Sequence, residues 1–300
     1  MKIPSISGTI IFIVILLHMK KIVLFWWYGM LGTEIAAFFE KEWYIIVKPR
    51  HVEVDIADYS VVHKYLAEQK PDVVINAAGK TGSPNIDRCE THKEETMITN
   101  VNGAVNVACA SKLLGVYNVY IGSGCIYQWD NEWKWFAESD APNYVGSFYS
   151  WTKVKAQELL EPFDVLQLRI RMPILSKPNS RNFIDKMAKY SHVINEWNSV
   201  TVVDDMLEAM KVLIEQKVTG IMNMVNPWVL YHHDMLALYK EIVDPNHSFT
   251  PISMEELTQK FVCAGRSNCM LSSDKLNAYI ELEPIQERIK KTMETYFSNK

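Results

Sequence analysis

The chain lacks the features that mark several protein classes. Basic residues are not in excess, since 31 lysines and arginines face 35 acidic residues and the net charge is -4. Proteins that track phosphates usually show a basic excess or stripe, so no nucleic-acid partner is expected. The five cysteines are an odd number in a long chain, which argues against a disulfide framework and favours the cytoplasm. No Cys/His group has metal-ligand spacing, and we expect no metal.

Long hydrophobic runs are also missing. The longest, at 9–17 behind Lys2, is shorter than the ~20 residues that a membrane-spanning helix needs. No small-x-small cleavage site follows it, so it does not match a signal peptide, and we expect no membrane partner. We treat residues 1–18 as an apolar extension outside the fold: an upstream artefact or dispensable tail, an added strand or helix, or an export element.

What remains has ordinary globular composition, with 48% hydrophobic and 22% charged residues. From residue 19, short apolar runs alternate with helical spacing. Strands are expected at 20–25, 43–47, 72–77, 117–121 and 165–169, and helices at 29–40, 59–69, 94–114 and 148–161. This alternation predicts an α/β fold with a doubly wound parallel sheet, whose ligands bind at the carboxyl ends of the strands.

The spacing becomes irregular after residue 171. Helices are expected at 179–194, 203–216, 233–242 and 284–297, the last opening with a proline that suits a first helical position. We therefore expect a dinucleotide-binding domain at 19–171, and a region at 172–300 that is mainly a substrate-binding lobe closing over the edge of the sheet.

A turn that resembles the glycine-rich turn of dinucleotide-binding proteins, but lacks its first glycine, follows the first expected strand. Gly29 and Gly32 stand at the second and third glycine positions of a G-x-x-G-x-x-G turn, but Trp26 stands at the first. Two glycines at a helix start also fit a plain strand-to-helix turn. An indole at a close-approach position either crowds the pyrophosphate or rotates away from it, and we expect the second.

The second strand ends without the acidic residue that binds the ribose 2′-hydroxyl of NAD. Lys48 and Arg50 stand there instead and could receive a 2′-phosphate. The sequence therefore predicts a preference for NADPH, with NADH as a possible second cofactor.

A catalytic pair lies on the helix expected at 148–161. Tyr149 and Lys153 are four residues apart and share one face. The lysine charge lowers the pKa of a phenol, which can then pass a proton to a carbonyl oxygen. Ser123, just past the fourth expected strand, can hydrogen-bond the same oxygen. Taken alone, the pair could equally be an exposed Tyr/Lys pair, but the three residues in this order match the short-chain dehydrogenase/reductase arrangement.

Other segments resemble that superfamily and one family within it. Asn76, Ala77 and Ala78 resemble its cofactor-lining element, and Asp55 and Ile56 its adenine-contacting segment. Segments 76–90, 124–127, 146–150, 169–174, 181–184 and 266–268 resemble the bifunctional UDP-4-keto-6-deoxyglucose 3,5-epimerase/4-reductases of plants and some large viruses. That family makes UDP-L-rhamnose and is similar to bacterial dTDP-4-dehydrorhamnose reductase; the resemblance runs from about residue 19 to the C-terminus.

The resemblance implies roles for further residues. Cys125 and Lys186 would exchange protons at the sugar carbons next to the C4 ketone, although alone they would pass for a buried hydrophobe and a solvated helix residue. Substrate-binding residues would be Thr81, Asn85 and Asn182, with Arg266 on the diphosphate, because a guanidinium binds phosphate oxygens in pairs.

The expected protein is thus a cytoplasmic enzyme, and a homodimer, that epimerises C3 and C5 of a nucleotide-linked 4-keto-6-deoxy sugar and reduces C4. Two rivals remain: a 4-reductase without epimerase activity, against which Cys125 argues, and a non-catalytic regulatory subunit on the same fold, which Trp26 keeps open. Trp151 and Trp228 are further departures from the family, which tends to have glycine at 228.

Overall fold

A six-stranded parallel sheet forms the centre of the molecule. The computed structural model describes residues 19–129 and 133–300, so the extension at 1–18 lies outside the described residues. The strands stand in the order β11-β6-β4-β3-β1-β2, and every neighbouring pair is parallel. Their bounds are β1 (Lys21–Phe25), β2 (Ile45–Val47), β3 (Val73–Asn76), β4 (Tyr117–Ser123), β6 (Val165–Ile170) and β11 (Gly220–Met224).

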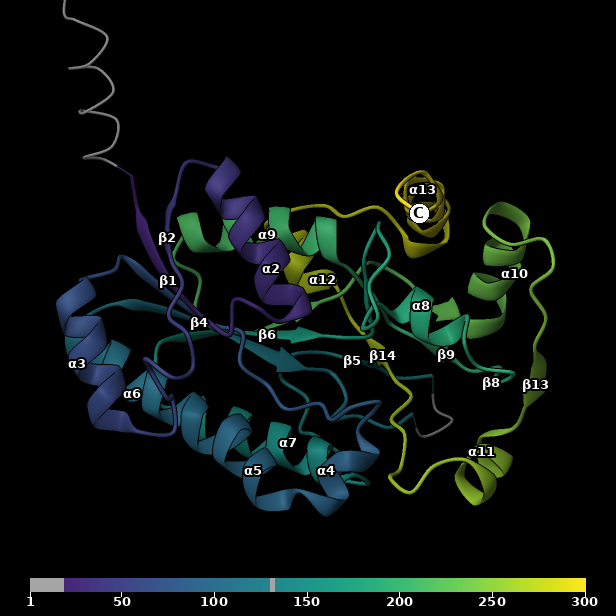
Figure 1. Ribbon diagram of the computed structural model, residues 1–300, viewed down its shortest axis with the longest axis horizontal. Helices are drawn as coiled ribbons and strands as arrows, with labels where there is room; N and C mark the ends of the chain where they lie inside the picture. Colours follow the sequence, from purple (N-terminus) through teal and green to yellow (C-terminus); the bar gives the residue numbers. More distant parts are fainter. Residues whose placement is uncertain (1–18, 130–132) are drawn as a thin grey trace, which may run out of the picture.

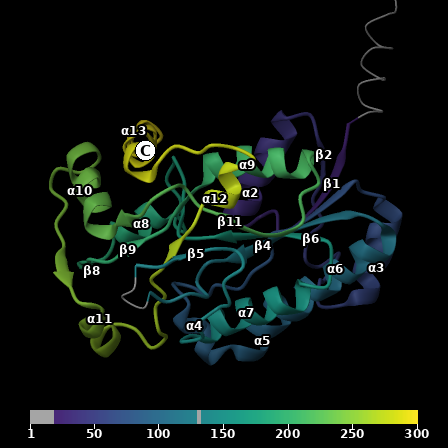
Figure 2. The same cartoon turned by 180° about the vertical axis from the view of Figure 1, so that it is seen from behind.

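Helices cover both faces of this sheet, as Figures 1 and 2 show. On one face lie α2 (Met30–Lys41) and α9 (Val203–Glu215), and on the other α3 (Tyr59–Gln69), α6 (Gly103–Leu114) and α7 (Phe148–Leu160). All four residues of β3 are buried, as a strand covered on both sides requires. The expected doubly wound α/β fold is confirmed. Its switch point lies beside β1, where the chain runs first to β2 and then back to β3.

The structure differs from the expected boundaries at several places. Residues 43 and 44 close α2 and do not extend β2, because the Tyr44 amide donates to the Phe39 carbonyl at 3.0 Å. The long helix expected at 94–114 is α5 (Lys93–Met97), a π-helical turn (Ile98–Asn102) and then α6. A sixth strand, β11, was not expected; it lies beside β6, so the sheet draws strands from both sides of residue 171.

The helix expected at 179–194 is wrong for most of its length. Only α8 (Phe183–Met187) is helical, with Asn182 as its N-cap, and β8 (His192–Ile194) then pairs in parallel with β13 (Thr250–Ile252). The chain leaves the helix here, and Val193 is buried in a second core while β8 pairs with β13.

This second core forms the C-terminal lobe. It joins α8, β8 and the helices α10 (His232–Ile242) and α13 (Ile285–Ser298). Pro284 is the N-cap of α13 and not its first residue. The shorter elements are α4 (Asp87–Thr91), α11 (Met254–Lys260), α12 (Asp274–Asn277), β5 (Trp135–Phe136), β7 (Pro173–Ile174), β9 (Trp197–Asn198), β10 (Thr201–Val202), β12 (Leu230–Tyr231) and β14 (Met270–Leu271).

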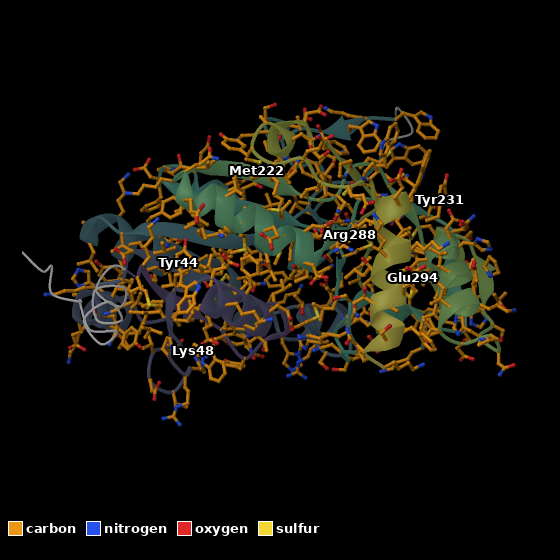
Figure 3. All side chains as sticks on the ribbon, turned by 90° about the horizontal axis from the view of Figure 1, so that it is seen from above. Tyr44, Lys48, Met222, Tyr231, Arg288 and Glu294 are labelled. Carbon is orange, nitrogen blue, oxygen red and sulfur yellow. The ribbon has the colours of Figure 1, made fainter. Side chains whose placement is uncertain are left out.

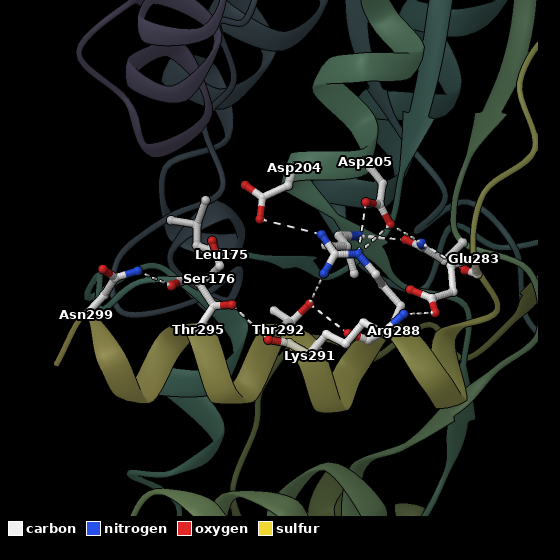
Figure 4. A network of polar contacts seen from close by, with 12 residues as sticks. Leu175, Ser176, Asp204, Asp205, Glu283, Arg288, Lys291, Thr292, Thr295 and Asn299 are labelled. Carbon is white, nitrogen blue, oxygen red and sulfur yellow. Dashed lines mark hydrogen bonds and ion pairs between the residues drawn. The ribbon is translucent and has the colours of Figure 1, made fainter.

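Arg288 ties this lobe to the sheet domain. Its guanidinium lies between α13 and the start of α9, as Figures 3 and 4 show. The Arg288 Nε donates to both carboxylate oxygens of Asp205 at 2.9 and 3.0 Å, and Nη1 donates to Thr292 at 3.1 Å. A charge-assisted pair with two contacts fixes direction as well as distance, so it orients α13 against α9. In the described ranges no helix has the length and apolar character needed to cross a bilayer.

Candidate active site

The polar residues singled out in the sequence meet at the carboxyl edge of β4. Ser123 is the last residue of that strand, and its Oγ accepts a hydrogen bond from the Cys125 amide at 3.1 Å. Tyr149 and Lys153 lie one turn apart on α7, and both are buried. Ser123 lies close enough to Tyr149 to lower the pKa of its phenol. The structure therefore brings together Ser123, Cys125, Tyr149 and Lys153, which come from two segments of the chain, 123–125 and 149–153.

Burial sets the protonation of Tyr149. It raises the pKa of the phenol to about 12, while the charge of Lys153 and the hydrogen bond with Ser123 act in the opposite direction. The lysine acts as expected, but the cost of burying a phenolate outweighs it. At neutral pH Tyr149 therefore keeps its proton, which is the state that a proton donor needs.

Hydrogen bonds to β4 of the central sheet hold the Lys153 ammonium in place. Its Nζ donates to the Tyr120 hydroxyl at 2.9 Å and to the Ile121 carbonyl at 3.2 Å. Burial lowers the pKa of Lys153, and the Tyr149 and Cys125 side chains partly offset this. A Cβ added at Gly79 would lie 3.7 Å from Nζ, so the absence of a side chain there leaves space beside the ammonium.

Asn100 is a site residue that the sequence analysis missed. It lies in the π-helical turn and is fully buried. Its side chain accepts from the Lys80 amide at 2.7 Å and donates to the Lys80 carbonyl and to Thr152. It thus joins the loop after β3 to the catalytic helix α7. Asn100 reaches these partners from a π-helical turn. No pattern in the sequence predicted this turn.

Cys125 faces a buried arginine that was also missed. The Arg171 Nη1 lies 2.7 Å from the Cys125 sulfur. The other terminal nitrogen of Arg171 donates to the Asn198 side chain at 2.5 Å and to the Ser267 carbonyl. Arg171 follows β6 directly, so the same sheet edge presents both the thiol and the guanidinium.

Lys186 lies on α8, which packs beside β7 just beyond Arg171. Burial lowers the pKa of Lys186, and the charge of Arg181 lowers it further. An amine with a lowered pKa is a better proton carrier near neutrality. Next to it, Arg181 reaches Thr81 in the loop after β3 at 3.5 Å. The two lobes thus approach each other where the substrate is expected.

Asn182 is placed differently from the expectation. It is fully buried, and its amide bonds to the main chain at Leu175 and Lys177. All of its hydrogen-bonding groups are engaged, so Asn182 shapes the loop before α8 and does not offer a group to a substrate. Asn85 likewise bonds its side chain to the Asp87 amide at 2.9 Å.

Arg266 forms an ion pair on the substrate side of the sheet. Its Nη1 donates to Asp87 at 2.9 Å. Burial raises the pKa of Asp87, but the hydrogen bonds from Arg266 and from the Ala264 amide outweigh this and hold it below its usual range. Arg266 is therefore positioned by Asp87 in advance, with its remaining nitrogens available to a diphosphate.

The expected cofactor residues line the switch point beside β1. A Cβ at Gly32 would lie 2.3 Å from the Trp26 carbonyl oxygen, so this close approach of helix to turn requires glycine. The Asn76 side chain accepts from the Ala78 amide at 3.0 Å, and Ile56 packs against Gly103. Asp55 accepts from the Ala57 amide at 2.9 Å, which fixes the loop after β2.

The two basic residues after β2 are already paired. Lys48 binds Glu40 at 2.6 Å, and Arg50 binds Glu53 at 2.8 Å. Both pairs are at least partly exposed, where such pairs contribute little. A 2′-phosphate with its higher charge could therefore compete for either cation.

Trp26 does not rotate away from the crevice, contrary to the expectation. A Cβ at Gly29 would lie 2.9 Å from the Trp26 indole, so the ring covers the helix N-terminus. Lys80, in the loop after β3, lies 5.7 Å from the ring centre. The cavity that Trp26 shares with Ile56 and Ala78 has a volume of only about 10 Å³, which is room for one water molecule.

The two ends of the expected cofactor site differ. Gly79 leaves space beside Lys153, whereas the Trp26 indole narrows the space at the N-terminus of α2, where a pyrophosphate would be expected. The side chain that narrows the site is the one residue that departs from the glycine turn.

Comparison with known proteins identifies relatives of this chain. The bifunctional dTDP-4-dehydrorhamnose 3,5-epimerase/dTDP-4-dehydrorhamnose reductase of Arabidopsis thaliana is 40% identical over 228 residues, which are 73% of this chain and 75% of that protein. A trifunctional Arabidopsis relative, a UDP-glucose 4,6-dehydratase/UDP-4-keto-6-deoxy-D-glucose 3,5-epimerase/UDP-4-keto-L-rhamnose-reductase, is 37% identical, and the match covers 78% of this chain but only 36% of that protein.

Solved structures give the same result. The UDP-rhamnose synthase of Acanthamoeba polyphaga mimivirus superposes with a TM-score of 0.87 and 31% identity, covering 92% of this chain and 99% of that one. The dTDP-4-dehydrorhamnose reductase of Bacillus anthracis, solved with NADP, shares the fold at a TM-score of 0.78 and 20% identity, with 94% and 99% covered. The family description "RmlD substrate binding domain" matches residues 19–297. The chain therefore belongs to the RmlD substrate binding domain family.

Proposed function

We propose that this protein epimerises C3 and C5 of a UDP-linked 4-keto-6-deoxy-D-glucose and then reduces C4 to give UDP-L-rhamnose. The observation that carries the proposal is the meeting of Cys125, Ser123, Tyr149 and Lys153 at one sheet edge. A reductase alone needs the last three. A thiol beside them supplies the additional acid/base that epimerisation requires.

Different residues carry out the epimerisation and the reduction. The C4 ketone makes the C–H bonds at C3 and C5 acidic, since the resulting charge spreads onto the ketone oxygen. Cys125 and Lys186 remove and return these protons. Ser123 hydrogen-bonds the ketone oxygen and orients it. Tyr149 donates its proton to that oxygen in the reduction, and Lys153 stabilises the phenolate that remains. The reduction also needs a hydride donor, for which we propose NADPH.

Epimerisation can be tested without the cofactor. The protein is incubated in D₂O with UDP-4-keto-6-deoxyglucose, and deuterium at C3 and C5 is followed by NMR. We expect exchange at both carbons. A sugar that stays fully protonated would contradict the epimerase part of the proposal and favour a plain 4-reductase.

The other features of the proposal are the compartment and the assembly. We place the enzyme in the cytoplasm, which the five free cysteines support, and we propose a homodimer, which the mass measured by light scattering would test. A regulatory, non-catalytic role is favoured by one observation, the Trp26 indole in the crevice. Absence of NADPH binding even after Trp26→Gly would support that role.

NADPH should be preferred over NADH. Lys48 and Arg50 can bind the 2′-phosphate, and no acidic residue ends β2 to bind a free ribose hydroxyl. We expect kcat/KM for NADPH to exceed that for NADH by about tenfold, equivalent to ~1.4 kcal/mol, in the Trp26→Gly variant, whose crevice is open. Arg50→Ala should reduce the preference. Lys64→Ala, an exposed lysine of α3, should leave it unchanged, and equal use of NADH would refute this prediction.

A further inference from the structure

Four tryptophans have a backbone conformation that large side chains rarely adopt. The φ angles of Trp26, Trp43, Trp133 and Trp228 are 64°, 62°, 56° and 70°. This is the left-handed region, where a Cβ crowds the following carbonyl and which glycine enters freely. Tryptophan accounts for 9 of 300 residues, yet it holds four of the seven left-handed non-glycine positions in the described chain. Composition alone does not produce such a concentration.

Trp43 occupies the left-handed position of a helix stop at the end of α2. The Trp43 amide bonds to the Glu40 carbonyl and the Tyr44 amide to the Phe39 carbonyl. The end of α6 has the same pattern: Gly115, at φ 67°, bonds to Lys112, and the next amide bonds to Ser111. This is the helix stop in which glycine is the usual left-handed residue. Position 43 is thus the counterpart of Gly115 with an indole added, and also of Lys217, which holds the same place at the end of α9 with φ 52°.

The indoles at three of these positions do not compensate for the strain by burial. The side chains of Trp43, Trp133 and Trp228 are 68%, 57% and 59% exposed. An exposed ring of this size adds little to a hydrophobic core. Trp133 contacts the Trp197 indole and Trp228 approaches the Trp135 indole. All three positions still have the backbone conformation that glycine adopts freely.

Trp26 shows the functional consequence. Its left-handed φ is that of the first residue of a tight turn, and its ring covers the N-terminus of α2 beside Gly29. Removal of the indole would open the crevice between that N-terminus and Lys80. The misfit between this chain and a dinucleotide thus comes from a single side chain, and the backbone beneath it is already shaped for glycine.

We propose that positions 26, 43, 133 and 228 are glycine positions, and that the protein made in its own cells carries glycine at all four. The common cause that we infer is a codon that those cells read as glycine and that differs from the codon of the remaining tryptophans. The remaining tryptophans, such as Trp151 inside α7, have ordinary backbone angles and fall outside the proposal.

Peptide sequencing by mass spectrometry on the protein isolated from its own cells tests this directly. Glycine at the four positions is expected, and tryptophan at any of them would overturn the proposal for that position. Recombinant chains give an independent test. Replacing all four tryptophans by glycine should raise the melting temperature by about 5–10 °C, because four strained residues are relieved. An unchanged or lower melting temperature would contradict the proposal. Trp151→Gly, within a helix, should instead lower it.

Titration calorimetry with NADPH then isolates position 26. Trp26→Gly should tighten NADPH binding at least tenfold relative to the printed chain, whereas Trp43→Gly should raise stability without changing NADPH affinity. Equal or weaker binding by Trp26→Gly would show that the indole does not obstruct the site. If the variant binds NADPH but converts no sugar, the proposed function fails while the glycine assignment stands.

A second, independent observation concerns the arginine beside the thiol. Arg171 is 2% exposed, and its Nη1 lies 2.7 Å from the Cys125 sulfur. The cost of burying a charge lowers the pKa of Arg171, but the Cys125 and Cys269 sulfurs outweigh this and raise it above its usual value. A buried guanidinium requires an anionic or strongly accepting partner. Cys125 is the group in contact with it that can become an anion at the reaction centre.

We infer that Arg171 is a positioning residue that holds the Cys125 sulfur in place and stabilises negative charge on it during proton transfer; this rests on the proposed epimerisation. Asn198 and the Ser267 carbonyl fix the other end of the guanidinium. The charged and titratable groups around Cys125 are Arg171, Lys153, Tyr149, Tyr144 and Cys269. Only the first two are cations, and Lys153 is engaged by Tyr120 and the sheet.

The test is the pH dependence of Cys125 alkylation by iodoacetamide, followed by peptide mass spectrometry, because it needs no enzymatic activity. In Arg171→Gln the rise of alkylation with pH should move at least one pH unit to the alkaline side, and the pH profile of deuterium exchange should follow. Arg171→Lys keeps a charge and should restore part of the shift. Asn198→Ala, which loosens the same network, should shift it less. Unchanged profiles in folded Arg171→Gln would overturn the inference, whereas a normal shift without exchange in the parent chain would refute the proposed function only.

Discussion

Replacement of Cys125 by serine should reduce deuterium exchange at C3 and C5 by about 10²–10⁴-fold, the usual contribution of a positioned acid/base. Serine keeps the size of the side chain but is a far weaker acid than a thiol. The backbone at this position should not change, since its contact with Ser123 comes from the amide. Reduction of an already epimerised 4-keto-rhamnose substrate should survive, because Tyr149, Lys153 and Ser123 are untouched.

Cys269→Ser is the matched control. Cys269 is buried in the same region, and its thiol donates to the Gly124 carbonyl at 3.4 Å, so it belongs to the packing around the site. Its replacement should cost some stability but should preserve exchange. Equal loss of exchange in both variants would mean that the effect comes from disturbed packing and not from a proton carried by Cys125.

Tyr149→Phe should have the opposite outcome. Deuterium should still enter at C3 or C5, while formation of the reduced sugar should fall by about 10²–10⁴-fold. The phenol is the only proton source that we assign to the C4 oxygen. Its pKa of about 12 keeps it protonated across the neutral range. The measurement is paired NMR detection of exchange and of reduced product in the same reaction.

Tyr127→Phe provides the comparison for this variant. Burial also raises the pKa of Tyr127 to about 12, yet its hydroxyl donates to the Asp140 carbonyl at 2.7 Å, away from the catalytic helix. It should leave reduction within a few-fold of the parent. If Tyr127→Phe were as inactive as Tyr149→Phe, the role of Tyr149 as proton donor would be contradicted. If Tyr149→Phe lost exchange as well, the assignment of separate roles would fail.

The sequence predicted those parts of the fold that depend on local pattern. The apolar runs located β1, β3, β4 and β6, since strands buried on both faces are continuous in hydrophobicity. The pattern did not locate β8, which is strand only because β13 lies beside it. Nor did it locate β11, whose sequence has a glycine and an asparagine among its apolar residues.

The residues of the candidate site also differ in whether the sequence could predict them. Tyr149 and Lys153 were found because their spacing is local, and Ser123 because it follows a strand. Cys125 was assigned only through the resemblance to the family. Asn100 and Arg171 were missed because their roles depend on partners far along the chain. Asn100 hydrogen-bonds to Lys80 and Thr152, which lie in two other segments of the chain. Arg171, which follows β6, contacts Cys125, which follows the neighbouring strand β4.

Trp26 was foreseen as the difficult residue, but the direction of its side chain was not. A sequence shows that an indole replaces a glycine; only coordinates show that φ is left-handed and that the ring covers Gly29. The expectation that the ring turns outward rested on the joint presence of the catalytic residues, which do not determine the conformation of this turn. The structure places the ring against Gly29 instead.

The central claim is most directly tested by the identity of the product. The Trp26→Gly variant is incubated with UDP-4-keto-6-deoxyglucose and NADPH, and the sugar is characterised by NMR. We predict UDP-L-rhamnose, in which C3 and C5 are inverted and C4 carries a hydroxyl. A reduced sugar that retains the original configuration at C3 and C5, or no reduced sugar from a variant that binds NADPH, would contradict the account.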